Sequence, residues 1–224
     1  MWSIKESPYD DGLRLIFADW LEDNGQRERA ELLRLQVGLE QLPIGDLHRV
    51  ELQKRVNELL AAHKRQWLGP WAGVGRIVHG LIDITCQAER LPELLAAAGG
   101  EAALSWVESL SLRGAWEDIS AVVGSPWLRH IAKLYLEHNG IGAAGAAALA
   151  ASPHLARLGL LYLSNNGIGA AGAAALAASP HLAQLSSLDL KHNDIGDAGA
   201  AALAASPHLA RLSSLGLTGN QIRE

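Results

Sequence analysis

The sequence predicts an α/β fold: a solenoid with parallel strands on its concave side and helices on its convex side, preceded by a small three-helix domain. Two observations carry this prediction. A phrase of strand, turn and helix recurs every 27 residues, beginning at Leu134, Leu161 and Leu188. A fixed period of this length is typical of a repeat architecture, here with about six strands. The N-terminal part lacks the phrase and shows apolar residues at helical spacing instead.

Each repeat opens with a short strand in which leucines alternate with other residues, as in Leu134-Tyr135-Leu136. Successive side chains of a strand point to opposite faces, so the leucines are expected to point into the stack and the intervening residues outward. A recurring asparagine follows each strand. Its amide is expected to satisfy backbone groups of neighbouring coils that would otherwise be buried without partners. This asparagine ladder comprises Asn139, Asn166, Asn193 and Asn220.

An alanine-rich segment follows each asparagine and predicts a short helix. Alanine has the best helix propensity, and its small side chain lets neighbouring helices pack closely. Each segment closes with Ser-Pro, at Pro153, Pro180 and Pro207. Proline cannot continue a helix, so these positions mark the helix ends.

The glycines Gly140, Gly142 and Gly145 also fit the Gly-x-Gly-x-x-Gly fingerprint of dinucleotide-binding turns. That motif needs an acidic residue about twenty residues further on, and the chain has none there. The stretch is repeated along the chain, and its third copy has Asp194 in place of the first glycine. The sequence therefore predicts no nucleotide and no other cofactor.

The repeat pattern L-x-x-L-x-L-x-x-N-x-I, clearest from Leu158 to Ile168, resembles the leucine-rich repeat. The 27-residue period with a full helix resembles the ribonuclease-inhibitor-like class of these repeats, over roughly the C-terminal half of the chain. The resemblance implies a solenoid that commonly binds protein partners along its concave sheet.

Weaker repeats are expected upstream, with strands at Val107–Leu112 and Ile82–Ile84. Terminal repeats are usually atypical, because the end coil must shield an apolar face. The expected domains are a helical domain at residues 1–72, degenerate N-terminal capping repeats at 73–131 and regular repeats at 132–224.

The helical domain is predicted from three apolar stripes, two on either side of an Asn-Gly break and one on a third helix at residues 46–66. Trp20 is expected in its core, with Phe17 and Leu33 nearby. The stripes comprise Leu13, Ile16, Phe17, Trp20 and Leu21; Ala30, Leu32, Leu33, Leu35 and Val37; and Val50, Leu52, Val56, Leu59 and Leu60.

Part of this domain resembles a short helical repeat-companion domain that accompanies leucine-rich repeats in some bacterial proteins. The string that carries the resemblance runs from Arg14 to Glu22, followed by Arg29–Glu31 and Leu33–Gln36. The resemblance implies a companion module and supplies no activity.

Composition limits the possible functions. The net charge is −5, and the sequence has no basic stripe for phosphate contacts, so no nucleic-acid partner is expected. The single cysteine, Cys86, favours a reducing compartment. The N-terminal MWSIKES lacks a signal pattern, and no run of eighteen apolar residues occurs. A cytoplasmic protein without membrane contact is expected.

No catalytic constellation or metal site is predicted, so the chain is not expected to be an enzyme. The histidines His154, His181 and His208 recur at equivalent positions, but helices of adjacent coils lie roughly 10 Å apart, too far for two imidazoles to share one ion. Asp19 and Glu22 are expected to be solvated or to pair with Arg14.

The sequence therefore predicts a protein–protein interaction module that binds its partner on the concave face. Tyr135 and Tyr162, on adjacent strands, are the candidate hot spot, because tyrosine buries much area at little entropic cost. The alternative is that the two rings only stabilise the sheet. The candidate partner-binding residues are Arg113, Lys133, Tyr135, Glu137, Tyr162, Ser164, Asp189 and Lys191.

Other functions stay open at this point. The chain stops at Glu224 in mid-repeat, without a polar capping repeat. A shortened sequence, a partner that covers the end, and two copies meeting there each account for this, and the last predicts a weak homodimer or a self-assembling scaffold. An inhibitor or regulator of an enzyme is a further alternative, as is a helical domain that carries the activity while the repeats target it.

Overall fold

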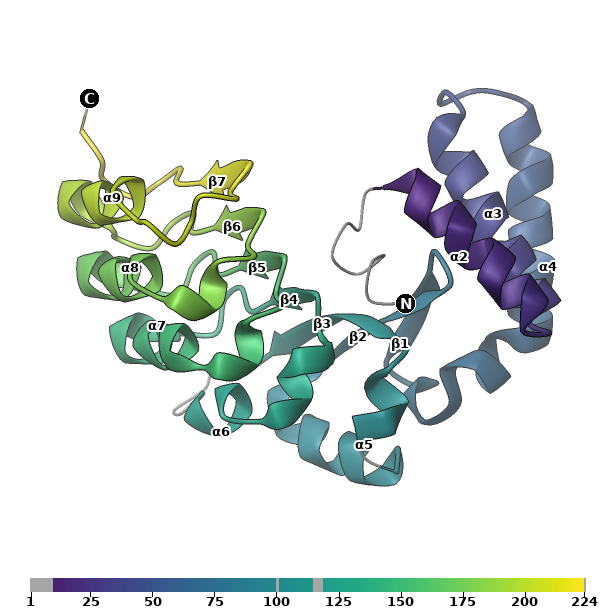
Figure 1. Cartoon of the computed structure of the whole chain (residues 1–224), viewed down its shortest axis with the longest axis horizontal. Helices are drawn as coiled ribbons and strands as arrows, with labels where there is room; N and C mark the ends of the chain where they lie inside the picture. Colours follow the sequence, from purple (N-terminus) through teal and green to yellow (C-terminus); the bar gives the residue numbers. More distant parts are fainter. Residues whose placement is uncertain (1–9, 100, 115–118, 224) are drawn as a thin grey trace. The chain divides into compact units, whose positions relative to one another are not determined.

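The computed structural model describes residues 10–99, 101–114 and 119–223. The chain forms two compact units, one up to Ile84 and one from Thr85 onward (Figure 1). The first unit contains helices and a β-hairpin, and the second contains the repeats. No helix in the described ranges is long and apolar enough to cross a membrane.

Three α-helices make up most of the described part of the first unit: α2 (Asp11–Asp23), α3 (Arg27–Gln41) and α4 (His48–Leu68). The Asp10 side chain caps α2 by accepting a hydrogen bond from the Leu13 amide at 3.1 Å. Helix α3 contacts both α2 and α4. Their buried apolar residues are Phe17, Ala18, Leu21, Ala30, Leu32, Leu33, Val37, Leu39, Val56, Leu59 and Leu68.

The buried face of α2 is shifted by about one residue from the apolar face that the sequence predicts. Ile16 is 65% exposed and Trp20 is 47% exposed, so Trp20 is not a core residue. The buried face of α2 consists of Arg14, Phe17, Ala18 and Leu21. The long apolar stem of an arginine can be buried while its charged head finds polar partners, and Arg14 takes the place expected for a leucine or isoleucine. The Trp20 ring instead stacks on the outer side of Phe17, with centroids 5.7 Å apart.

The third stripe needs a similar correction at its start, because Val50 is 69% exposed while Val56 and Leu59 are buried. The first turn of α4 therefore contributes less to the core than its sequence indicates. A shallow hollow of about 750 Å³ lies there, between α4 and the end of α3. It is lined by Leu39, Arg49, Val50, Gln53, Lys54, Asn57, Glu58 and Ala61.

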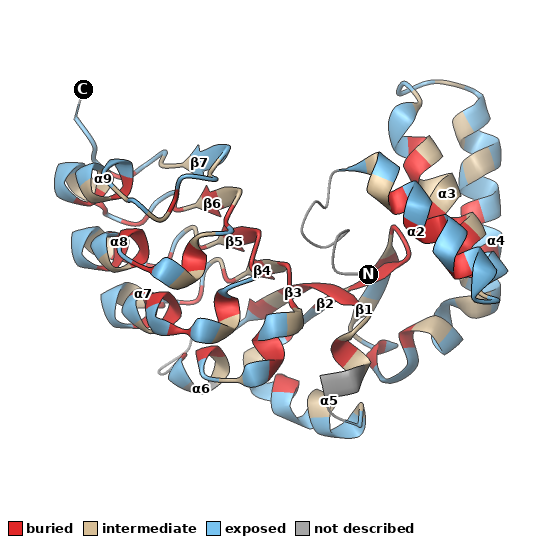
Figure 2. Cartoon of the chain, in the orientation of Figure 1, coloured by how far each residue is buried: buried red, intermediate tan, exposed pale blue. Residues whose placement is uncertain are grey.

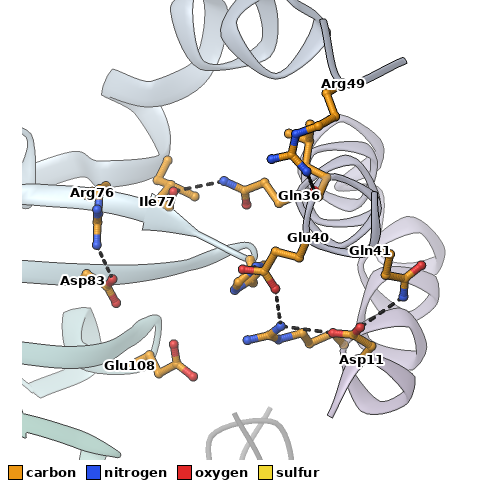
Figure 3. Close-up of polar contacts among 12 residues, drawn as sticks. Asp11, Gln36, Glu40, Gln41, Arg49, Arg76, Ile77, Asp83 and Glu108 are labelled. Atoms are coloured by element: carbon orange, nitrogen blue, oxygen red, sulfur yellow. Dashed lines mark hydrogen bonds and ion pairs between the residues drawn. The ribbon is translucent and has the colours of Figure 1, made fainter. Parts of the chain in front are cut away.

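Asp19 and Glu22 are exposed, as one of the two expected alternatives has it, whereas the other alternative, a pairing with Arg14, is wrong. Both carboxylates pair with Arg34 of α3, each at 2.7 Å. Arg14 is buried and pairs with Asp11 and with Glu40, both at 3.2 Å (Figure 3). Two separate sets of ion pairs thus connect α2 to α3.

A hairpin that was not expected in full completes the first unit. After the short turn η1 (Gly69–Trp71), strand β1 (Gly75–Val78) pairs antiparallel with β2 (Leu81–Gln87), with Val78 opposite Leu81. His79 and Gly80 form the turn, with φ of 46° and 73°. Two consecutive residues with positive φ make the tight hairpin turn whose twist matches that of the strands.

Side chains of α3 form hydrogen bonds with this hairpin. The Arg29 Nε donates to the Gly80 carbonyl at 2.9 Å. The Gln36 Nε2 donates to the Ile77 carbonyl at 3.3 Å (Figure 3). The His79 Nε2 lies 3.0 Å from a Glu40 carboxylate oxygen. Burial lowers the pKa of the Arg29 guanidinium to about 10. Arg29 and Gln36 belong to the N-terminal sequence string noted above, and these contacts give both residues a structural role.

The second unit repeats a strand, a helix and a short 3₁₀ turn. It starts with η2 (Ala88–Arg90), α5 (Leu91–Ala97) and η3 (Glu101–Leu104). Its strands are β3 (Val107–Arg113), β4 (Lys133–Tyr135), β5 (Leu160–Tyr162), β6 (Ser187–Asp189) and β7 (Ser214–Gly216). Its later helices and turns are α6 (Ser120–Val123), η4 (Pro126–His130), α7 (Gly142–Ala151), η5 (Pro153–Leu155), α8 (Gly169–Ala177), η6 (Pro180–Leu182) and α9 (Gly196–Ala204).

The strands β3 to β7 pair in parallel and in sequence order. The register places Leu134 opposite Leu161 and Leu161 opposite Leu188, so equivalent leucines form a row between the sheet and the helices. These leucines are buried, and the buried residues of α7 and α8 lie on the sides that face the strands (Figure 2). The described chain thus has seven strands where about six were expected, and β1 is the addition.

The glycine fingerprint is explained by packing and backbone conformation. A Cβ on Gly172 would meet Ile168 Cγ2 at 2.5 Å and the neighbouring Ala146 Cβ at 3.0 Å, so only glycine lets α8 lie this close to α7. Gly140 and Gly167 have φ of 65°, a left-handed conformation that glycine adopts at no steric cost. In the third copy Asp194 takes this conformation with φ of 56°, which accounts for the loss of a glycine there.

Candidate functional site

The face of the sheet opposite the helices, here called the strand face, presents the residues between the buried leucines. Figure 1 shows the strands β4 to β7 on one side of the second unit and α7 to α9 on the other. The parallel register aligns Ser111, Tyr135, Tyr162 and Asp189 in one row across four strands. The row is intermediate in exposure along its length, because neighbouring side chains partly cover each other.

The rings of Tyr135 and Tyr162 stack on each other at the centre of this row. Their centroids are 4.8 Å apart and their planes differ by 17°. Offset aromatic pairs of this kind hold both rings in one orientation and leave their outer surfaces available. The pair forms a flat aromatic platform on β4 and β5.

A depression of about 550 Å³ lies beside the platform, at the carboxyl ends of β3 and β4. Strand ends contribute one side of it, and the turns that follow contribute the other. It is lined by Ser111, Leu112, Arg113, Gly114, Tyr135, Glu137, His138, Asn139 and Ser164. Hydroxyl, guanidinium, carboxylate and imidazole groups thus converge on one hollow next to the two tyrosines.

Arg113 and Glu137 carry the charges of this depression. Arg113 is exposed and Glu137 is half-buried, and neither makes an ion pair within the described part of the chain. A cation and an anion that make no ion pair with the described residues thus line the same polar hollow. Such groups can bind the charged ends of a peptide segment without first breaking an internal ion pair.

Two other candidate residues pair with each other. The Lys191 Nζ lies 3.1 Å from an Asp189 carboxylate oxygen, and the Asp189 Oδ1 accepts a hydrogen bond from the Lys191 amide at 2.9 Å. Their charges largely cancel. This part of the strand face is therefore polar and close to neutral.

Lys133, one of the candidate partner-binding residues, is mostly buried. Its Nζ lies 3.0 Å from the Glu108 Oε2, and only 12% of the Lys133 side chain and 3% of the Glu108 side chain are exposed. The two form a buried ion pair next to the start of the tyrosine row. Glu108 was missed by the sequence analysis, although an isolated glutamate between Val107 and Leu110 in an apolar strand is a signal that a cation lies nearby.

Asn139, the first asparagine of the ladder, lines the depression. The Asn166 Oδ1 accepts hydrogen bonds from the amides of Asn139 at 2.9 Å and Ile141 at 3.3 Å. The Asn166 Nδ2 donates to the carbonyls of Leu136 at 2.9 Å and Leu163 at 2.8 Å. The same pattern links Asn193 to the coil before it and Asn220 to the coil of Asn193.

The turn residues before the ladder have an unusual backbone. His138, Asn165 and His192 have positive φ, at 59°, 59° and 55°. Each donates its backbone N–H to the carbonyl of the next coil, as His138 does to Ser164 at 3.1 Å. The left-handed turn directs the chain from the strand to the helix and places the His138 side chain at the mouth of the depression.

Among residues 10–99, 101–114 and 119–223, no three His, Cys, Asp or Glu side chains come together as a metal site. Burial raises the pKa of the Cys86 thiol, which disfavours the reactive thiolate at neutral pH. Within the described residues, no hydrogen bond joins the Ser111 or Ser164 hydroxyl to the His138 ring or to the Glu137 carboxylate.

A comparison with known families gives a match in the second unit. The family described as Leucine Rich repeat matches residues 128–150, 160–177 and 181–204. These stretches fall on consecutive coils of the second unit and contain η4, β4, α7, β5, α8, η6, β6 and α9 in whole or in part. A comparison with curated proteins finds no match.

Proposed function

We propose that the strand face of the repeats binds a protein partner, because this chain is a leucine-rich repeat protein. Leucine-rich repeats are in general interaction modules without catalytic activity. The observation that carries the proposal is the Tyr135–Tyr162 platform beside a hollow lined by Arg113 and Glu137, which make no ion pair with the described residues.

The composition of this surface supports a protein partner over a small ligand. Hot spots of protein interfaces are rich in tyrosine and arginine and are surrounded by polar groups. Here two tyrosines and one arginine lie within three neighbouring strands, with Ser111 and Ser164 around them. The hollow is open and polar, unlike the apolar, enclosed cavities that hold most small molecules.

The contacts beneath the surface support the proposal as well. Leu134 and Leu161 anchor the two tyrosine-bearing strands in the core, and the asparagine ladder ties each following turn to its neighbours. Side chains held on a fixed backbone lose less conformational entropy on binding. The strand face therefore presents the two rings in a geometry that is already formed before binding.

A photo-crosslinking experiment in the organism that makes the protein tests the proposal. A photo-reactive amino acid is placed at Ser164 or Thr218 on the strand face, and at Ala147 or Ala174 on exposed positions of α7 and α8. The expected result is a crosslink to the same protein from both strand-face positions and none from the helices. Crosslinks that form only from α7 and α8, or from no position, would contradict the proposal.

A further inference from the structure

A second surface of the repeats lies where the chain passes from each helix to the next strand. This helix-to-strand edge consists of residues 125–132, 152–159, 179–186 and 206–213. None of the four segments contains an aspartate or a glutamate. Their basic and imidazole residues are Arg129, His130, His154, Arg157, His181, His208 and Arg211.

The four segments lie side by side. The amide of Gly159 donates to the Ala132 carbonyl at 2.9 Å, and the amide of Ser186 donates to the Gly159 carbonyl at 2.8 Å. The amide of Ser213 continues the series by donating to the Ser186 carbonyl at 2.9 Å. Residues at equivalent positions of successive repeats are therefore neighbours on the surface.

One such column contains Arg157, Gln184 and Arg211, all exposed. An Arg211 Nη1 hydrogen bond to Gln184 Oε1 shows that neighbouring members of the column touch. Because the middle position is a neutral glutamine, the two guanidinium groups are separated by a polar group instead of lying directly against each other. Arg211 makes no ion pair within residues 119–223.

The carboxylates of the regular repeats lie elsewhere. Within residues 119–223 they are Glu137, Asp189, Asp194 and Asp197, which belong to strands, to the turns after them or to the start of α9. Asp189 pairs with Lys191, while Asp194 accepts a hydrogen bond from Gln221 and Asp197 accepts one from the Arg223 amide. Within residues 119–223, the segments of the edge thus contain basic residues and no carboxylate.

Helix dipoles explain only part of this arrangement. The helices α7 and α9 end at Ala151 and Ala204, so cations near these ends are favourable. That effect falls off within the last turn, whereas Arg157 and Arg211 come well after it. The histidines of the Ser-Pro-His-Leu turns are consistent with a helix-end effect, and the two arginines are not.

We infer that the helix-to-strand edge binds an acidic, extended peptide segment. Neighbouring coils are about 4.8 Å apart at the strands, so Arg157 and Arg211 are separated by roughly 10 Å. An extended chain covers about 3.3 Å per residue, so carboxylates about three residues apart reach both guanidinium groups. Arg157 and Arg211 bind the carboxylates, and Gln184 contacts the peptide between them. This surface is separate from the strand face.

Fluorescence anisotropy with a labelled deca-glutamate peptide tests the inference on the full chain. The variant Arg157→Gln/Arg211→Gln is compared with Lys54→Gln/Lys64→Gln on α4, which removes the same charge from the other unit. Glutamine is the residue of the middle repeat at this position, so the fold is expected to tolerate it, and circular dichroism checks this. The arginine variant is expected to lower the affinity by about fivefold or more, and the lysine variant leaves it unchanged.

The two double variants distinguish a specific peptide site from general attraction between the chain and a polyanion. Salt weakens the binding of the parent chain, because the contacts lie in solvent. Equal losses in both double variants, or no binding of the peptide at low salt, would overturn the inference. Binding of single-stranded DNA or of anionic vesicles without binding of the peptide would overturn it too. Failure here leaves the strand-face proposal intact, because no strand-face residue is changed.

Discussion

The side chain of Asn166 lies one repeat after Asn139 and accepts a hydrogen bond from its backbone N–H across 2.9 Å. Asn166 also donates to the carbonyls of Leu136 and Leu163, so one amide joins two coils through buried groups. Backbone groups that lose such a partner cost free energy because water does not reach them. The ladder is therefore expected to matter more for the stability of the repeats than its small area indicates.

Replacement of Asn166 by alanine should lower the free energy of unfolding by about 2–4 kcal/mol, since several buried backbone groups lose their partner. Urea unfolding measures the change. The matched control is Asn165→Gly at the exposed neighbouring position with φ of 59°, where glycine fits the backbone. A loss for Asn166→Ala no larger than that for Asn165→Gly would show that the ladder is not a main source of stability.

The Lys133–Glu108 pair gives a second prediction. Lys133→Met should cost about 3 kcal/mol of stability, because it leaves the buried Glu108 carboxylate poorly compensated. Adding Glu108→Gln removes the buried charge and should restore part of the loss. Thermal unfolding of the single and double variants measures this coupling. Additive losses, with no recovery in the double variant, would contradict it.

The outer position of Trp20 gives a third prediction. Trp20→Ala should cost no more than about 1 kcal/mol, because the ring is half exposed and leaves no closed cavity. Phe17→Ala, on the same helix and 4% exposed, should cost about 3–5 kcal/mol. Chemical unfolding of both variants provides the comparison. Equal losses would place Trp20 in the core after all.

The Glu31–Arg55 pair gives a prediction for acid pH. Hydrogen bonds from Arg55 lower the pKa of the Glu31 carboxyl, and a depressed pKa means that the ionised form stabilises the folded chain. This contribution is complete above the ordinary glutamate pKa and is lost as the pH falls through the lowered value. In Arg55→Gln the pKa of Glu31 should rise, as an NMR titration of its side-chain carboxyl carbon measures. The variant Lys54→Gln, one position earlier on α4, should leave the pKa of Glu31 unchanged.

Much of the fold was predictable because the same sequence pattern occurs in each of several repeats. The strands, helices and helix ends of residues 132–204 follow from periodic leucines, alanines and prolines, and the family match covers the same region. In the helical unit, by contrast, each sequence pattern that predicts a helix face occurs only once. The face of α2 was misassigned because Arg14 contributes a buried stem that a count of apolar residues does not register.

Other features depend on contacts between distant residues. The strand β1 is only four residues long, and its His79-Gly80 turn lacks the common Asn-Gly or Asp-Gly signal. Lys133 was assigned to the surface because it alternates with leucines. The parallel register places Ser109 opposite it, and this brings the preceding Glu108 within reach. Residue spacing along one strand does not contain this information.

The affinity of the crosslinked partner for purified variants tests the strand-face proposal most directly. In titration calorimetry, Tyr135→Ala/Tyr162→Ala should weaken binding by about thirtyfold or more, as expected for a hot spot worth at least 2 kcal/mol. The control Ile16→Ala/Trp20→Ala removes two exposed apolar side chains from the helical unit and should leave the affinity as in the parent chain. The opposite pattern, with binding kept in the tyrosine variant and lost in the control, would contradict the proposal and move the site to the helical unit.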